Sequence, residues 1–468
     1  MSTSEALHDR FQRNSPFCLK LRVSAGTDPT EAICAKVVQA NAVVSEIGIA
    51  ELTDAARLYD VTVFTNGDEH LAKIRQAIES INGIEVLAVE DPAMESHRGG
   101  ACEMRARSAI QSNTDLRIVY TPGVARVCRS IEADPEQARE YTNIGNKVAI
   151  ATNGTAILGL GDIGPLAGLP VMEGKAAIFW TFAGVSAEPL LIDTKDPEEF
   201  IDIVMKLACG FCAIQIEDVA APECFRITRE LDRRLAIPVF HDDQHGTATI
   251  VLTGLYSALK IVGRDIGEVR CVISGAGAAG TAIADVLARA GVNDVVLCDS
   301  AGVIYRGRER NMNEEKVALA ERTNKENISG LLADAMKGRD LFIGVSRPNI
   351  VTEDMVAAMA EDSIVFALAN PVSEIGQSEA LKAGAAVYAN GRTINNALAY
   401  PGIFRGALDA EAESITIEMM MAAAHGLARI VPEGELMPEM MDAATHQAVA
   451  EAVRTAAGDA HSRQQERT

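Results

Sequence analysis

The sequence predicts an α/β protein with three folded parts, and three observations support this fold class. Residues 16–92 place strands and helices in the order β-α-β-β-α-β, which is ferredoxin-like. Farther along the chain, apolar runs lead into acidic residues at Glu217 and Asp242, as parallel strands of an open α/β sheet do at a ligand crevice. A glycine-rich turn at residues 275–280 then separates an apolar strand from a helix, which is the Rossmann-type pattern.

Composition excludes several classes of protein. The 468 residues are 48% hydrophobic, which is enough for two or three domains with cores of their own. A net charge of −22 disfavours nucleic-acid and anionic-membrane partners. The N-terminus lacks an apolar signal segment, and the nine cysteines are scattered as in a reducing compartment. We therefore expect a cytoplasmic protein.

We expect a flexible N-terminus at residues 1–15 and a first folded part at residues 16–92. Its expected strands are 17–23, 43–51, 58–65 and 84–89, and its expected helices are 30–39 and 68–82. With the turn at residues 25–28, this unit resembles an ACT domain, a regulatory module that often binds amino acids between paired copies. A purely structural dimerisation domain is the alternative.

Residues 93–247 form the second expected domain, in which four carboxylates gather. Glu217 and Asp218 follow one strand, and Asp242 and Asp243 follow the next. Clustered carboxylates raise one another's pKa, so a cation should neutralise them, and oxygen ligands favour Mg²⁺ or Mn²⁺. The alternative is that these acids cap helices.

Two further side chains of this domain are candidates for proton transfer. Tyr120 precedes Thr-Pro-Gly, a turn from which its hydroxyl can project, although a packed tyrosine is the alternative. Lys175 follows a glycine and enters an apolar run, where burial would lower its pKa and make it a base. The alternative is a solvent-facing lysine at a strand start. Near it, the pattern Gly159–Gly164 is followed by prolines that argue against a phosphate-binding helix.

Residues 248–432 form the dinucleotide-binding domain, followed by a C-terminal helix and tail at 433–468. The phosphate-binding turn comprises Gly275, Gly277, Ala278, Ala279 and Gly280. Asp299 ends the second strand, where an acid binds ribose hydroxyls and repels a 2′-phosphate, which favours NAD. NADP stays possible, because Arg306 or Arg308 could reach a phosphate.

Two asparagines, Asn370 and Asn396, follow later strands of this domain. Their amide groups could hold a substrate carboxylate. Turn formation is the alternative role, since asparagine is favoured in turns.

Together these residues resemble the malic enzyme family in its compact bacterial form. The matching motifs are Tyr120-Thr-Pro-Gly-Val-Ala, Gly159-Leu-Gly-Asp-Ile-Gly with Lys175, Glu217-Asp218, His241-Asp-Asp-Gln-His-Gly, Ala369-Asn-Pro and Asn395-Asn396. The resemblance implies NAD(P)-dependent oxidation and decarboxylation of malate to pyruvate. It implies Glu217, Asp218 and Asp243 as metal ligands, Lys175 as base, Tyr120 as acid, Asp242 as the residue that orients them, Asn370 at coenzyme and substrate, and Asn396 at the substrate.

The sequence also departs from the family. Thr155-Ala156 stand where larger members carry an arginine before the Gly-Leu-Gly-Asp loop.

We expect a homodimer or homotetramer, with an amino acid or another metabolite as effector of the ACT-like domain. The alternatives are another ACT-regulated dehydrogenase of hydroxy acids or amino acids, which needs no metal, and a catalytically silent amino-acid sensor.

Overall fold

The computed structural model describes residues 15–24, 29–52, 56–157, 159–370 and 372–465. The predicted turn at 25–28 and residues 1–14 of the predicted N-terminal segment lie outside them. The chain separates into two compact units, Met1–Glu103 and Met104–Thr468. The sequence places a boundary between residues 92 and 93, whereas the first unit runs on to Glu103, because helix α4 (Pro92–Ser96) packs against strand β1 (Ser15–Ser24). Among the described residues, no helix is both long and apolar enough to cross a membrane.

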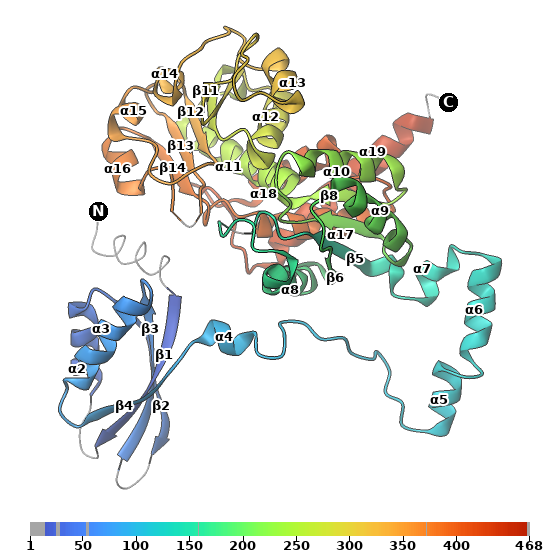
Figure 1. The fold of residues 1–468 in the computed structure, drawn as a ribbon, viewed down its shortest axis with the longest axis horizontal. Helices are drawn as coiled ribbons and strands as arrows, with labels where there is room; N and C mark the ends of the chain where they lie inside the picture. The colour runs from blue at the N-terminus through green and yellow to red at the C-terminus, as the bar shows by residue number, and fades with distance from the viewer. Residues whose placement is uncertain (1–14, 25–28, 53–55, 158, 371, 466–468) are drawn as a thin grey trace. The chain divides into compact units, whose positions relative to one another are not determined.

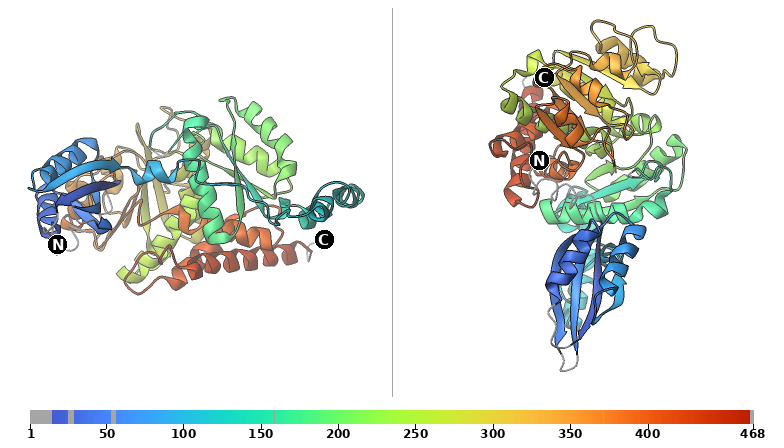
Figure 2. Two further views of the ribbon diagram at one scale, coloured as in Figure 1. Left: turned by 90° about the horizontal axis from the view of Figure 1, so that it is seen from below. Right: turned by 90° about the vertical axis from the view of Figure 1, so that its left-hand side faces the viewer.

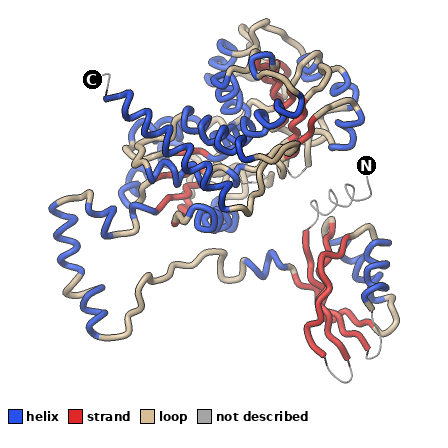
Figure 3. The backbone as a smooth tube through the Cα atoms, turned by 180° about the vertical axis from the view of Figure 1, so that it is seen from behind, coloured by secondary structure: helices blue, strands red, loops and turns tan. Residues whose placement is uncertain are grey.

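The N-terminal unit is a four-stranded antiparallel sheet with two helices on one face (Figure 1 and Figure 3). The strand order is β2-β3-β1-β4, which with the helices makes the predicted ferredoxin-like order. Alternate residues Leu19, Leu21 and Val23 of β1 are fully buried, as the strand period requires. The elements after β1 are α2 (Thr30–Gln39), β2 (Val43–Leu52), β3 (Ala56–Thr65), α3 (Asp68–Glu79) and β4 (Ile84–Glu90).

Three short helices open the second unit, and none of them has a buried residue: α5 (Asn113–Val119), α6 (Val124–Ala133) and α7 (Gln137–Tyr141). The stretch before Tyr120 is helix α5. The reason is an N-cap, since the Ser112 side chain accepts a hydrogen bond from the Asp115 N–H and so satisfies the first turn.

A parallel four-stranded sheet of order β6-β5-β7-β8 follows. Its strands are β5 (Lys147–Thr152), β6 (Ser186–Leu191), β7 (Ala213–Ile216) and β8 (Val239–His241). Its helices are α8 (Pro165–Ala183), α9 (Pro197–Leu207), α10 (Glu223–Arg234) and α11 (Thr247–Val262). Every residue of β7 and β8 is buried, as expected for a parallel sheet with both faces covered.

Residues 165–183 form one continuous helix, α8, although the prolines and glycines of this stretch predict that no regular helix forms there. Pro165 occupies the first turn, where a missing N–H costs nothing, and Gly184 ends the helix with φ +60°. Gly168 lies so close to Ile157 that a Cβ there would approach the Ile157 Cδ1 to 2.6 Å. Tertiary packing therefore overrides the local signals, and it places Lys175 in mid-helix.

The Rossmann-type part is a six-stranded sheet of order β11-β10-β9-β12-β13-β14, parallel except for β11. Its strands are β9 (Arg270–Ser274), β10 (Asp294–Asp299), β11 (Gly302–Val303), β12 (Leu341–Gly344), β13 (Ile364–Ala367) and β14 (Val387–Asn390). Its helices are α12 (Ala278–Ala290), α13 (Glu314–Arg322), α14 (Leu332–Met336), α15 (Glu353–Ala357) and α16 (Gln377–Lys382). The predicted fold class is therefore confirmed for this part of the chain.

The C-terminal helices pack against one another and against the middle sheet's helix α8. Helices α17 (Tyr400–Asp409) and α18 (Ile417–Ile430) both contact α19 (Ala443–Gln465), and the red helices of Figure 2 show this layer. The predicted boundaries at residues 247 and 432 both lie inside the compact unit Met104–Thr468, because α11 and α19 pack across them.

Candidate functional site

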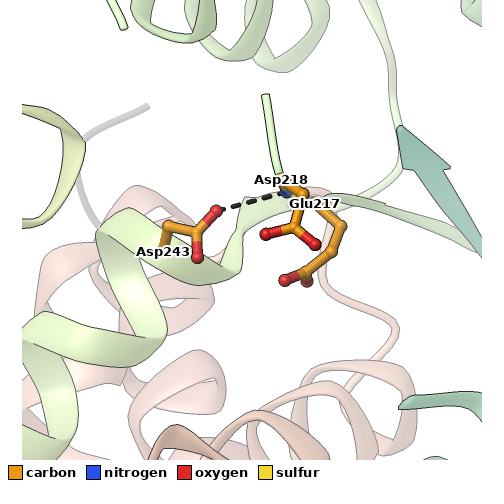
Figure 4. Close-up of side chains that lie close together, drawn as sticks. All are labelled: Glu217, Asp218 and Asp243. Atoms are coloured by element: carbon orange, nitrogen blue, oxygen red, sulfur yellow. Dashed lines mark hydrogen bonds between the residues drawn. The ribbon is translucent and has the colours of Figure 1, made fainter. Parts of the chain in front are cut away.

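Acidic side chains meet where β7 and β8 end. The two strands are parallel neighbours, with Ile216 opposite His241, so the residues that follow them emerge at one edge of the sheet. Carboxylate oxygens of Glu217, Asp218 and Asp243 all lie within 4.8 Å of one another (Figure 4). This gathering is what the sequence predicts.

The three carboxylates are held in a defined arrangement. The Asp218 N–H donates to Asp243 Oδ2 at 3.2 Å, and Asp218 adopts a left-handed φ of +51° that turns the chain after β7. Glu217 and Asp218 are buried, and Gln215 Nε2 donates to Glu217 Oε2 at 2.6 Å. Burial raises the pKa of Glu217 well above its ordinary value, and burial raises that of Asp243 as well. A divalent cation would offset this unfavourable burial of charge, so the donor set fits a hard metal ion.

Lys175 reaches the same cluster from α8. Its Nζ lies 2.5 Å from Asp242 Oδ2 and 3.0 Å from Glu217 Oε1, and its side chain is 11% exposed. Burial alone would lower the pKa of Lys175, but the carboxylates of Asp242 and Glu217 outweigh burial and raise it well above its ordinary value. The expectation of a lowered lysine pKa is therefore wrong for this arrangement, because a lysine beside unneutralised carboxylates keeps its proton.

Asp242 links Lys175 to Asn396. Besides the contact with Lys175, Asp242 Oδ2 accepts a hydrogen bond of 2.8 Å from Asn396 Nδ2. Asp242 is fully buried, and a Cβ on Gly246 would come 2.0 Å from its Oδ1, so only glycine fits at that position. Asn396 thus lies in the cluster, and its role at the substrate stays a prediction.

Tyr400 also belongs to the cluster, and sequence reasoning missed it. Its ring centroid lies 4.9 Å from Lys175 Nζ, which is cation–π range, and the residue is 1% exposed. Burial raises the pKa of its hydroxyl, which has no hydrogen-bond partner among the described residues. The available signal was its position four residues after Asn396, at the start of a helix.

Two other predicted residues are not brought to Lys175. Tyr120 is the C-cap of α5 and is 66% exposed, and no contact joins it to Lys175 in the part of the chain that is described. Asn370, after β13, is exposed and lies beside Gly391, where a Cβ would come 2.8 Å from Asn370 Nδ2.

Thr155, one of the two residues that depart from the family pattern, makes two hydrogen bonds beside the cluster. Its hydroxyl donates to Asn153 Oδ1 at 2.7 Å and accepts from the Ala220 N–H at 2.9 Å. It therefore joins the loop after β5 to the loop after β7, which carries Asp218.

The second glycine turn has the geometry of a pyrophosphate cradle. Gly275 has φ +117°, and a Cβ there would approach the Val345 carbonyl oxygen to 2.6 Å. A Cβ on Gly280 would lie 1.8 Å from the Gly275 oxygen, whereas one on Gly277 would meet nothing within 4 Å. The space beside Gly277 is therefore open, and Ala278 and Ala279 begin α12, whose N-terminus favours an anion.

Asp299 ends β10 as predicted, but its carboxylate is not free. Arg308 Nη2 donates to its two oxygens at 2.6 and 2.7 Å, and Lys316 Nζ donates to Oδ2 at 2.7 Å. Burial alone would raise the pKa of Asp299, but these hydrogen bonds hold it below its ordinary value. Asp299 is therefore ionised and paired.

Comparisons with known proteins agree on one family. The family model for "Malic enzyme, N-terminal domain" matches residues 100–232, and that for "Malic enzyme, NAD binding domain" matches residues 244–394 and 385–457. An NAD-dependent malic enzyme of Geobacillus stearothermophilus is 44% identical over 86% of this chain and 85% of its own length. An NADP-dependent malic enzyme of Escherichia coli is 44% identical over 71% of this chain and 44% of its own length.

Among solved structures, malic enzyme from Pyrococcus horikoshii superposes with a TM-score of 0.76 at 43% identity. That match covers 79% of this chain and 90% of the archaeal chain. Both family models begin after the ferredoxin-like part of the chain.

Proposed function

The chain belongs to the malic enzyme family, and on this basis we propose that it oxidises (S)-malate and decarboxylates it to pyruvate and CO₂ while reducing a nicotinamide coenzyme. The observation that carries this proposal is the contact of Lys175 with Asp242 and Glu217 beside two further carboxylates. A base, a metal-type donor set and a dinucleotide-type turn on one chain are the parts that this reaction requires.

Glu217, Asp218 and Asp243 are the proposed ligands of Mg²⁺ or Mn²⁺. Their oxygen donors, their burial and the raised pKa values of Glu217 and Asp243 support this assignment. An ion held by these three carboxylates would supply Lewis-acid chemistry, stabilising negative charge that develops on the substrate during decarboxylation.

Lys175 is the proposed base for the C2 hydroxyl proton. Asp242 holds its Nζ in place, and Asn396 in turn holds Asp242. Lys175 can accept a proton only when its amine is neutral. The carboxylate of Glu217 helps to raise the pKa of Lys175, so a cation that neutralised Glu217 would lower that pKa again. The resemblance also assigns Asn370 to coenzyme and substrate, and this role stays a proposal.

Tyr120 is the proposed acid that protonates enolpyruvate at carbon. It is exposed, and so are Leu116, Ile118 and Val119 of the same segment. Exposed apolar side chains on consecutive turns indicate a surface that another chain covers. We therefore propose a homodimer or homotetramer whose assembly brings the Tyr120 hydroxyl to the reaction site.

The residues proposed to hold the coenzyme's pyrophosphate are Gly275, Gly277, Ala278, Ala279 and Gly280. The bound coenzyme would supply the hydride acceptor that malate oxidation needs. The N-terminal unit is proposed to be an ACT-like regulatory domain that binds an amino acid or another metabolite. Its ferredoxin-like order supports this role without excluding a structural one. A cytoplasmic location is proposed with it, since all nine cysteines are free thiols.

Malate-dependent reduction of NAD and of NADP, followed by absorbance with and without Mn²⁺ after chelator treatment, tests the reaction. We expect turnover that needs both malate and the metal ion, with pyruvate as product. Metal-independent oxidation of another hydroxy acid or an amino acid would instead support a different ACT-regulated dehydrogenase. Binding of amino acids without turnover of any such substrate would support a silent sensor.

A further inference from the structure

Glu374 is a buried acid of the Rossmann-type part, whereas the acidic cluster lies on the middle sheet. It follows β13 in the segment that begins with Asn370, and its side chain is fully buried. Its Oε1 accepts a hydrogen bond of 2.9 Å from the Ser346 N–H, and its Oε2 accepts one of 3.1 Å from the Ala369 N–H. A Cβ on Gly344 would lie 2.3 Å from the Glu374 Cδ, so the glycine leaves room for this carboxylate.

The carboxylate of Glu374 forms no ion pair with a lysine or arginine in the part of the chain that the structure describes. Burial raises its pKa above the ordinary value, and the N–H groups of Ser346 and Ala369 oppose that rise. Because one N–H donates to each oxygen, both oxygens act as acceptors, which favours the charged form. A buried charge without a partner is unfavourable, so a cationic ligand near this position would be stabilising.

Glu374 connects two loops at the carboxyl edge of the Rossmann-type sheet. Ser346 follows β12 and Ala369 follows β13, and these two strands are parallel neighbours. The strand order reverses between β9 and β12, and open α/β sheets bind dinucleotides across such a reversal, at the carboxyl ends of the strands. The adenosine ribose meets the residue that ends β10, so the nicotinamide half of the coenzyme belongs on the side of β12 and β13.

The loop after β12 is also fixed to the glycine turn. The Val345 N–H donates to the Ser274 carbonyl oxygen at 2.9 Å, and the hydroxyl oxygens of Ser274 and Ser346 lie 3.0 Å apart. A Cβ on Gly275 would come 2.6 Å from the Val345 carbonyl oxygen. Through Ser346, Glu374 therefore holds a loop that itself packs against the proposed pyrophosphate turn.

We propose that Glu374 is a positioning residue that selects the oxidised coenzyme, because it holds the loops after β12 and β13 and its buried negative charge attracts a cationic nicotinamide ring. That ring is cationic when oxidised and neutral when it carries the hydride. The attraction therefore exists for the coenzyme that enters the reaction and disappears for the coenzyme that must leave. This inference rests on the proposed function, because it requires the coenzyme to bind at the glycine turn.

The test measures the dissociation constants of NAD⁺, NADH, NADP⁺ and NADPH by calorimetry, without malate, in the unaltered chain and in Glu374→Gln. Two unit charges about 10 Å apart shift an equilibrium on the order of tenfold at the effective dielectric constant of about 20 that suits protein sites. We therefore expect Glu374→Gln to weaken binding of the oxidised forms about tenfold more than binding of the reduced forms. Glu361→Gln is the matched control, since Glu361 is exposed and lies just before β13, at the opposite edge of the sheet. Its oxidised-to-reduced preference should equal that of the unaltered chain.

A second pair of variants separates charge from lost hydrogen bonds. Glu374→Asp and Glu374→Asn both shorten the side chain by one methylene group, and they differ from each other only in charge. Both should bind either form of the coenzyme less tightly, because the contacts with Ser346 and Ala369 are lost. Glu374→Asp should nevertheless keep the oxidised-to-reduced preference of the unaltered chain, whereas Glu374→Asn should lose about tenfold of it.

The outcomes distinguish this inference from the proposed function. Equal weakening of oxidised and reduced forms in Glu374→Gln, with the same preference in Glu374→Asp and Glu374→Asn, overturns the inference and leaves the malic enzyme function intact. If none of the four coenzymes binds the unaltered chain, the proposed function fails instead. Thermal denaturation of each variant shows whether a loss reflects unfolding, and if Glu374→Gln does not fold, the comparison of Glu374→Asp with Glu374→Asn decides.

Discussion

Asp243 is the most accessible of the three clustered carboxylates. Its Oδ2 accepts a hydrogen bond from the Asp218 N–H, which connects the segments that follow β7 and β8. Asp243→Asn removes one negative ligand but preserves the shape of the side chain. We expect Mn²⁺ affinity and kcat/KM for malate to fall on the order of 100-fold or more, since even outer partners of metal ligands are worth 10–100-fold. Metal titration and steady-state kinetics measure both quantities.

Coenzyme binding should change little in Asp243→Asn, because the glycine turn lies on another sheet. Asp202→Asn is the matched control, because it makes the same chemical change at an exposed aspartate of α9. Its metal affinity and turnover should equal those of the unaltered chain. Undiminished metal-dependent turnover in Asp243→Asn would contradict the metal assignment.

Lys175 has two carboxylate partners and an aromatic ring beneath it, so its ammonium group is fixed in position. Lys175→Met should reduce malate oxidation by about 10²–10⁴-fold, the range that general bases contribute. Coenzyme affinity, measured by fluorescence titration, should stay close to that of the unaltered chain. Lys206→Met on α9 controls for loss of charge, and a pure loss of coenzyme affinity in Lys175→Met would place this lysine elsewhere.

Tyr120 can be separated from the base by comparing partial reactions. Tyr120→Phe should slow enolpyruvate protonation more than hydride transfer, since it removes only a proton donor. Transient kinetics of coenzyme reduction and of pyruvate release measure the two steps. Tyr141, another exposed tyrosine in the same run of short helices, provides the control Tyr141→Phe. Equal slowing of both steps in Tyr120→Phe would mean that Tyr120 is only structural.

At the scale of elements, Asp340 joins helix α11 to the Rossmann-type sheet. It lies just before β12 and accepts from Arg264 Nη1 at 2.6 Å and from Arg270 N and Nε at 2.8 and 3.0 Å. Burial alone would raise the pKa of Asp340, but these arginines hold it below its ordinary value. The folded state thus binds a proton at Asp340 less readily than the unfolded state does.

The sign of the pH effect follows from that lowered pKa. The stabilisation is fully present above the unfolded aspartate pKa and is lost as the pH falls through the folded pKa. Asp340→Asn should therefore lower the unfolding free energy at neutral pH by about 2 kcal/mol, the value of hydrogen bonds to a charged group. Denaturant titrations at neutral and acid pH measure this difference, which should shrink in acid. A pH-independent difference would show that charge at Asp340 is not the cause.

At the scale of the whole molecule, the N-terminal unit has a core of its own, formed by β1, α2 and α3 residues such as Leu21, Ile33 and Ile74. The family models begin at residue 100, after the last strand of this unit, β4. A chain beginning near Glu95 should therefore keep malate turnover but lose its response to a small effector. Initial rates of both forms across a panel of amino acids and central metabolites measure that response, typically about 1–3 kcal/mol of coupling.

If both forms respond identically across the panel, the N-terminal unit is structural. Size-exclusion chromatography with light scattering is needed beside the rates, because removal of a pairing surface can change the oligomer. A truncated chain that assembles normally and stays sensitive would contradict the regulatory role.

The sequence alone determined those features that depend on local chain order. Strand alternation predicted β1, and the glycine turn before a helix predicted the Rossmann-type part. The placement of Glu217 and Asp243 at one sheet edge was also predictable, because parallel neighbouring strands end on the same side.

Tertiary structure decided the charge state and accessibility of the site residues. Lys175 and Asp242 lie 67 positions apart, and the pKa of Lys175 rises only because α8, which packs on β5 and β6 of the same sheet, brings it to Asp242. The pairing of Asp299 with Arg308 was equally hidden in the sequence, although the expected ribose-binding role of Asp299 depends on a free carboxylate. The contact of the Tyr400 ring with Lys175 was also visible only in the folded chain. Electrostatic and steric effects follow distance in space, whereas the sequence reports only distance along the chain.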